Sequence, residues 1–208
     1  LHMVSFITLP AMVGLMVLSE PLVRIFFEKG HFTSAETIAT VNAMMFYSVG
    51  LWSASLQRIV VPAYYSFQNT HFPAFVSFSS LGILASLCFL FIKPLAHSGL
   101  ALAVAFSSIF QISVLLWFFR KKYVCFQWSE LFLPQLKHLG AALCMGVILY
   151  AIQTEFQWKG EGRFSTNCLI LLCLVSGGII FYTLLSYFLK TQEFLYLHQR
   201  LLRRKLSR

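Results

Sequence analysis

Six runs of mostly apolar residues, each long enough to cross a membrane, restrict what this 208-residue chain can fold into more than any other feature. They cover residues 1–19, 37–60, 73–92, 98–119, 135–153 and 167–189. A helix that crosses the hydrocarbon core of a bilayer needs about 20 such residues. Only 11% of the residues are charged, against roughly 25% in a soluble domain. The sequence therefore predicts an all-α integral membrane protein with about six transmembrane helices.

The stretch from Gln57 to Pro73 interrupts this apolar sequence with polar side chains, paired aromatic residues and two prolines. Proline lacks a backbone N–H and biases the preceding residue away from the helical conformation. Pro62 and Pro73 are therefore expected to bracket a turn between the second and third helices. In the first run, Pro10 and Gly14 are the expected kink points.

A short interfacial helix is predicted near residues 21–29, between the first two runs. Leu22, Ile25 and Phe26, with Phe27 beside them, fall on one face of such a helix, and Gly30 is placed to cap its C-terminal end. Glu20 and Arg24 are four residues apart and would pair on the water-facing side. An ordinary solvated ion pair is the simpler interpretation of these two charges.

The basic residues predict how the chain is oriented. With six crossings, eleven of the sixteen Lys and Arg residues fall on one side: Arg58, three in the loop 120–134, Lys137 and six in the tail 190–208. The excess of Lys and Arg marks the cytoplasmic side, so the C-terminus is expected there. The formal charge of +9 is thus explained by membrane orientation, and no nucleic-acid partner is expected. The basic tail is also suited to contacts with anionic membrane lipids.

Ionisable side chains are almost absent from the runs, and the candidates for a substrate path are one arginine, a few amides and a tyrosine. Arg58 either extends to the cytoplasmic interface or, with Gln57, faces a water-filled cavity and binds an anionic head group through its planar guanidinium. Asn42 and Gln111 carry amides, which within a membrane bond a neighbouring helix more often than a substrate. Tyr65, in the polar stretch after the second run, is the remaining candidate.

Catalytic machinery is not expected. The chain has no Asp, so a Ser-His-Asp set is excluded, and the six His residues show no metal-ligand spacing. No phosphate-binding or dinucleotide-binding glycine motif is present, and no cofactor is predicted. The five cysteines include no CxxC pair, which favours buried thiols over a disulfide or zinc framework. The chain opens inside an apolar pattern, and we expect it to be a portion of a longer protein.

Several ordered motifs resemble the MviN/MurJ-type lipid II flippases. The matching residues are Pro10 with Gly14-Leu15; Ser19-Glu20-Pro21-Leu22-Val23; Phe27-Glu28-Lys29-Gly30-His31-Phe32-Thr33; Tyr47-Ser48-Val49-Gly50-Leu51; Arg58, Pro62, Tyr64-Tyr65, Gln68, Thr70 and Pro73; and Gly99-Leu100-Ala101-Leu102. Asn69 departs from the pattern, because the family often has Asp there. Residues 120–208 match only in hydropathy and topology.

The resemblance implies a place in the multidrug/oligosaccharidyl-lipid/polysaccharide exporter superfamily, and for these flippases an architecture of fourteen helices in two lobes. Residues 1–119 would supply helices of the second lobe, and residues 135–189 the last two helices, which form a groove for a polyprenyl tail. The implied partners are the undecaprenyl-pyrophosphate-linked peptidoglycan precursor, membrane lipids and an N-terminal lobe that this chain lacks. The implied activity is movement of that precursor across the bacterial inner membrane by alternating access.

Two alternatives remain open at this point. One is a different exporter of the same superfamily, for polysaccharide-linked lipids or drugs. A cation-coupled drug exporter would be expected to carry acidic residues within its helices, which the apolar runs lack. The other is a membrane scaffold without transport activity that recruits cell-wall enzymes through its basic tail.

Overall fold

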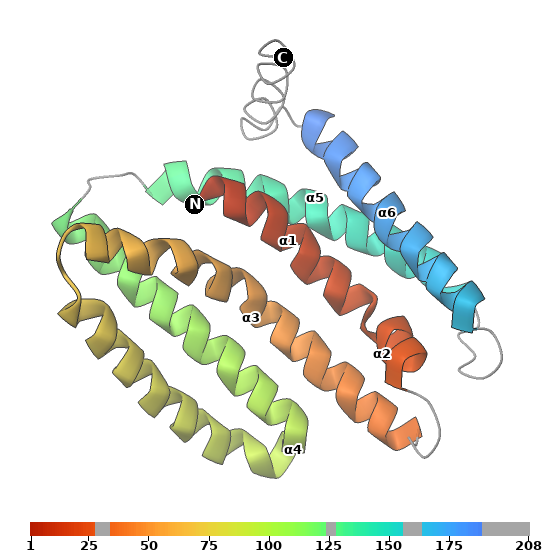
Figure 1. Ribbon diagram of the computed structural model, residues 1–208, viewed down its shortest axis with the longest axis horizontal. Coiled ribbons are helices and arrows are strands. Elements are labelled where there is room, and N and C mark those ends of the chain that lie inside the picture. The colour runs from red at the N-terminus through yellow and green to blue at the C-terminus, as the bar shows by residue number, and fades with distance from the viewer. Residues whose placement is uncertain (28–33, 124–127, 156–163, 189–208) are drawn as a thin grey trace.

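The computed structural model describes residues 1–27, 34–123, 128–155 and 164–188, and within these ranges the chain forms six helices and no strand. The predicted all-α class is therefore confirmed (Figure 1). The helices are α1 (His2–Val17), α2 (Ser19–Phe27), α3 (Ser34–Ser66), α4 (His71–Lys122), α5 (Trp128–Thr154) and α6 (Phe164–Phe188).

The predicted number of six membrane crossings is not confirmed. Within the described ranges, four segments are long and apolar enough to cross a bilayer: His71–Lys93, Ser98–Lys122, Leu133–Thr154 and Ser165–Phe188. The bent pair α1 and α2 would add a fifth. The second predicted run lies in α3, which is long enough at 33 residues but is not among these four. Its several Ser residues, with Asn42, Gln57 and Arg58, make it more polar than the others.

The long helix α4 contains two of the predicted runs and folds back on itself. Its 52 residues are helical throughout, yet the chain reverses near its middle so that the two halves lie antiparallel beside α3 (Figure 1). At this reversal a Cβ on Gly99 would lie 2.6 Å from the carbonyl oxygen of Phe91. Glycine at position 99 is therefore what allows the two halves to approach this closely.

Two clusters of buried side chains hold the helices together. The first joins α1, α2, α5 and α6 and includes Phe6, Val13, Ile25, Met145 and Tyr182, while the second joins α3 and α4 and includes Leu56, Tyr64, Val76 and Leu115. Trp52 packs against both clusters, and its indole N–H donates a hydrogen bond of 3.1 Å to the Ser5 hydroxyl. This contact connects α3 to α1.

The bend in the first run lies later than predicted. α1 continues through Pro10 and Gly14 to Val17, and the chain then turns by 65° into α2. The turn is at Leu18, whose N–H still bonds the Gly14 carbonyl at 2.8 Å. A proline at position 10 removes one backbone hydrogen bond, but packing against neighbouring helices keeps α1 continuous there.

The buried face of α2 differs in part from the predicted one. Ile25 is buried as expected and Leu22 is partly buried, but Phe26 and Phe27 are 54% and 59% exposed, and Val23 is 1% exposed instead. The reason is that α2 packs against α3 and α6 as well as α1, so residues on more than one face are covered. Whether α2 lies at the membrane interface stays a prediction.

The predicted pair of charges on α2 is confirmed, because Arg24 and Glu20 form an exposed ion pair of 2.9 Å. The expected cap at Gly30 lies outside the described residues, and so does the tail 190–208. The loop predicted at 120–134 is shorter than expected. α4 extends to Lys122 and α5 begins at Trp128, in part because basic residues in the last turn of α4 favour helix there.

Candidate functional site

The predicted turn between the second and third runs lies at residues 67–70. α3 ends at Ser66 and α4 begins at His71, which confirms a turn bracketed by Pro62 and Pro73. Pro62 lies inside the last turns of α3, and Pro73 is fully buried in the first turn of α4. Gln68 adopts a φ of 55°, the left-handed conformation that lets the chain reverse direction.

Asn69 connects this turn to the end of α4. Its Nδ2 donates to the Tyr123 hydroxyl at 2.8 Å, and its Oδ1 accepts a hydrogen bond from the Phe72 N–H at 3.3 Å. The side chain therefore satisfies one backbone donor at the start of α4, as a capping residue does. An Asp at this position would keep the second bond but would have no N–H to donate.

The paired aromatic residues before the turn have different environments. Tyr64 is 1% exposed and donates its hydroxyl to the Leu115 carbonyl at 2.7 Å. The Phe119 and Tyr123 rings meet it edge-on, with centroids 5.2 and 5.8 Å away. Tyr65 is 51% exposed. Only Tyr65 of the pair is thus available to a ligand.

The described charges are distributed unevenly between the two ends of the helices. The α3–α4 turn and the C-terminus of α4 lie together at one end, here called the turn end, and α2, the reversal in α4 and the end of α5 lie at the opposite end (Figure 1). The turn end carries Arg58, Arg120, Lys121, Lys122 and Lys137. Glu20, Glu36 and Glu155 lie toward the opposite end, with Arg24 and Lys93, while Glu130 belongs to the first turn of α5 at the turn end. Lys121 lies 5.4 Å from the centre of the Trp117 ring.

Two of the predicted substrate-path residues use their amides to join helices. The Gln57 Nε2 donates to the Ser108 carbonyl at 2.9 Å, which links α3 to the second half of α4. The Gln111 Nε2 donates to the Ser77 hydroxyl at 3.0 Å and its Oε1 accepts from Ser80 at 3.3 Å. These bonds hold the two halves of α4 together, which is the commoner role for an amide inside a membrane.

The other three candidates, Arg58, Asn42 and Tyr65, are exposed. Arg58 and Tyr65 are seven residues apart, so they share one face of α3 near the turn end. Asn42 lies roughly 160° around an ideal helix from Arg58 and several turns away. The structure therefore brings Arg58 and Tyr65 onto a common surface and leaves Asn42 apart from them.

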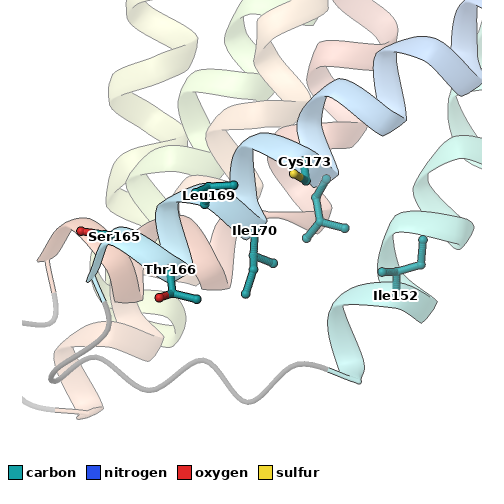
Figure 2. Close-up of a pocket in the computed structure, with 7 residues that line it drawn as sticks. Ile152, Ser165, Thr166, Leu169, Ile170 and Cys173 are labelled. Carbon is teal, nitrogen blue, oxygen red and sulfur yellow. The ribbon is translucent and has the colours of Figure 1, made fainter.

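A cavity lies between α5 and α6, the two helices for which the resemblance implies a groove. Its volume is about 490 Å³, and its lining comes from one residue of α5 and six of α6: Ile152, Ser165, Thr166, Leu169, Ile170, Cys173 and Leu174. Figure 2 shows the α6 side chains along one stretch of that helix, with Ile152 across the gap. The lining is mostly apolar, with two hydroxyls at the start of α6. Its volume falls within the range of about 300–1,000 Å³ that is usual for small-molecule sites.

No group of three or more His, Cys, Asp or Glu side chains in the described part of the chain could hold a metal ion. The cysteines Cys88, Cys144, Cys168 and Cys173 carry free thiols, but the expectation that they are buried is wrong, because Cys144 and Cys173 are exposed and the other two are only partly buried. Two features of the described part are suited to binding: the apolar cavity between α5 and α6, and the basic and aromatic surface at the turn end.

Comparison with known proteins connects these features to one family. The family described as lipid II flippase MurJ matches residues 1–172. A probable lipid II flippase MurJ of Bdellovibrio bacteriovorus is 27% identical over 188 residues, which are 90% of this chain and 35% of that protein. A protein of the same description from Buchnera aphidicola subsp. Baizongia pistaciae is 29% identical over 203 residues, or 93% of this chain and 38% of that one.

A solved structure has the same overall arrangement of helices. It is described as lipid II flippase MurJ in an inward closed conformation, and it superposes with a TM-score of 0.68 and 28% identity. The matched region covers 89% of this chain and 37% of the solved one. The chain thus spans a little over a third of the length of these relatives.

Proposed function

This chain belongs to the MurJ family of lipid II flippases, and on that basis we propose that it forms the C-terminal part of a protein that moves lipid II across the bacterial inner membrane. The observation that carries the proposal is the continuous family match over residues 1–172, which runs from α1 through α5 into α6. Because this chain spans little more than a third of its relatives, a cavity able to hold the lipid head group requires an N-terminal lobe as well.

The proposed activity is transport without covalent chemistry. A cycle between inward-open and outward-open states is driven by differences in how strongly each state binds the lipid or an ion, or in how each responds to the membrane potential. The concentration of described cations at the turn end supports a cytoplasmic location for that end. By the same argument the tail 190–208 is cytoplasmic and α2 lies at the opposite interface.

Arg58 is proposed as the residue of this chain that meets a lipid phosphate. It is exposed, it shares a face of α3 with Tyr65, and it lies at the turn end, where most of the described Lys and Arg residues are. Gln57, Asn42 and Gln111 would have supporting roles along the path. The amides of Gln57 and Gln111 act by holding together the helices that line this path.

The cavity between α5 and α6 is proposed to hold part of the polyprenyl tail. Its apolar lining suits an isoprenoid chain, because burial of apolar surface contributes about 25 cal/mol for each Å² removed from contact with water. Polyprenyl substrates also distinguish this family from an exporter of water-soluble drugs. The two C-terminal helices would then provide a lateral site for the tail while the head group crosses.

Cysteine protection tests the tail site directly. Cys173 lines the cavity, and Cys144 is an exposed thiol on α5 outside its lining. Two single-cysteine variants, each retaining one of these thiols, are reacted with a membrane-soluble maleimide with and without undecaprenyl phosphate. We expect the lipid to slow the labelling of Cys173 several-fold and to leave Cys144 unchanged. Equal rates at Cys173 with and without the lipid would contradict the tail site.

A chimaera tests the transport function as a whole. In the probable lipid II flippase MurJ of Vibrio cholerae, this chain would replace the matching third, to which it is 28% identical over 186 residues. We expect the chimaera to support growth when the host flippase is depleted, and to expose lipid II at the outer leaflet. A chimaera present in the membrane at normal abundance, with α1–α6 folded by protease protection but with no exposed lipid II, would argue against the proposal.

A further inference from the structure

One backbone hydrogen bond is missing from α1, at a point within the bundle. Pro10 lies inside α1 and has no N–H, so the carbonyl of Phe6, four residues earlier, lacks its usual helical donor. Phe6 is buried at 7% exposure in the cluster that joins α1, α5 and α6. Water is not available in such a place to replace the missing bond, and a buried carbonyl without a donor is costly.

A side chain from the last helix supplies this donor. The Tyr182 hydroxyl, in α6, donates to the Phe6 carbonyl oxygen at 3.0 Å, and Tyr182 is 3% exposed. The two residues are 176 positions apart in the sequence, so the contact joins the first helix to the last. The Phe6 ring also packs against the Tyr182 ring, with centroids 5.3 Å apart.

His138 of α5 completes the junction of the three helices. It is 0% exposed, its ring meets the Phe6 ring edge-on with centroids 5.3 Å apart, and its Nδ1 lies 3.5 Å from the Tyr182 hydroxyl. A hydroxyl has one proton to donate. Since Tyr182 gives that proton to the Phe6 carbonyl, a hydrogen bond with His138 requires the tautomer in which Nδ1 carries the hydrogen.

We propose that Tyr182 supplies the hydrogen bond that Pro10 removes from α1, and that this bond fixes the position of α6, and with it the cavity, relative to α1. The remainder of α6 packs largely on α5, where Gly178 lies against Leu149 and Met145. The cavity-lining residues 165–174 lie two to five turns before Tyr182 on the same helix. Tyr182 is thus a positioning residue, and its importance for transport rests on the proposed function.

A thermodynamic cycle separates this role from ordinary packing. Tyr182→Phe, Pro10→Ala and the double variant are made in the full chain, and their melting temperatures are measured in detergent. With Pro10 present, Tyr182→Phe leaves the Phe6 carbonyl without a donor, and we expect a fall of about 2–4 °C. With Pro10→Ala, the backbone N–H at position 10 bonds that carbonyl, and the same Tyr182 change should lower the melting temperature by at most half as much.

Tyr64→Phe is the matched control. It also removes a buried hydroxyl bonded to a helical carbonyl, that of Leu115, but the residue four positions later is Phe119, which has its own N–H. The effect of Tyr64→Phe should therefore be the same with and without Pro10. An effect of Tyr182→Phe that is likewise independent of Pro10 would overturn the proposal.

The positional part of the proposal has a separate measurement. Spin labels are placed at Ile7 of α1 and Leu184 of α6, which are 64% and 53% exposed, in a background without native cysteines. We expect Tyr182→Phe to weaken the dipolar broadening between the labels, both with and without Pro10, because Pro10→Ala restores the backbone bond but not the link between helices. Unchanged broadening would refute the positional role. Neither measurement involves lipid II, so failure of the flippase assignment would leave both results standing.

Discussion

The reversal within α4 allows a prediction in which two glycines of one helix respond oppositely to the same change. A Cβ added at Gly99 would meet the Phe91 carbonyl oxygen at 2.6 Å and its carbonyl carbon at 2.9 Å, whereas a Cβ at Gly82 meets nothing within 4 Å. Real Cβ atoms essentially never lie under 3.0 Å from another atom. Since the obstructing atoms at Gly99 belong to the backbone, the two halves of α4 would have to move apart.

Both Gly99→Ala and Gly82→Ala gain helix propensity, which is worth roughly 1 kcal/mol for each. That gain cancels in the difference between the two variants. The remaining difference is the cost of overpacking at Gly99, which we expect to be about 1–3 kcal/mol of unfolding free energy. At about 2–4 °C for each kcal/mol in a chain of this size, Gly82→Ala should melt clearly above Gly99→Ala.

The assay is thermal unfolding in detergent, followed by circular dichroism, with the parent protein alongside. Gly82→Ala should equal or exceed the parent in melting temperature. If Gly99→Ala melted together with Gly82→Ala, the close approach of the two halves at Phe91 would be refuted, and with it the account of why glycine stands at this position.

Three further predictions concern the turn and the exposed charges. Asn69→Asp should change the unfolding free energy by less than about 0.5 kcal/mol, because Tyr123 can donate its hydroxyl proton to the carboxylate. Asn69→Ala loses both hydrogen bonds and should cost about 1 kcal/mol in the same denaturation assay. Arg58→Ala should leave stability within about 0.5 kcal/mol and reduce the lipid II exposed by the chimaera; undiminished exposure would mean that Arg58 only extends to the interface. Glu20→Gln breaks the exposed ion pair with Arg24 and should lower the unfolding free energy by less than about 1 kcal/mol. A larger loss in the denaturation assay would contradict the surface character of this pair.

Much of the local architecture follows from the sequence. The last four apolar runs are helices long enough to cross a bilayer, because a chain in lipid must satisfy its backbone internally and the helix is the local way to do so. The turn at residues 67–70 follows from Pro62 and Pro73, and the pairing of Glu20 with Arg24 follows from their spacing. The family, too, is readable from ordered motifs between Pro10 and Leu102, and the match over residues 1–172 confirms it.

Only the tertiary structure decided which of two similar residues is buried and which is exposed, and which partner a polar side chain bonds. Tyr64 and Tyr65 are adjacent and identical in type, yet one is buried against α4 and the other is exposed. Gln57 could have faced a cavity or a helix, and only the position of Ser108 settles where its amide is bonded. Helical periodicity gives the faces of a helix but not its neighbours, so the exposure of Phe26 on α2 was not predictable from spacing alone.

The cavity between α5 and α6 and the bond from Tyr182 to Phe6 arise only in the folded molecule. The proline at position 10 predicts from the sequence that one helical carbonyl will lack its hydrogen-bond donor. The neighbouring sequence does not specify which group donates to that carbonyl instead. The replacement comes from a residue 176 positions away, brought there by the packing of α6 on α5 and α1. Apolar periodicity and proline chemistry act over a few residues and are therefore written in the sequence, whereas contacts between distant helices depend on how all their surfaces fit together.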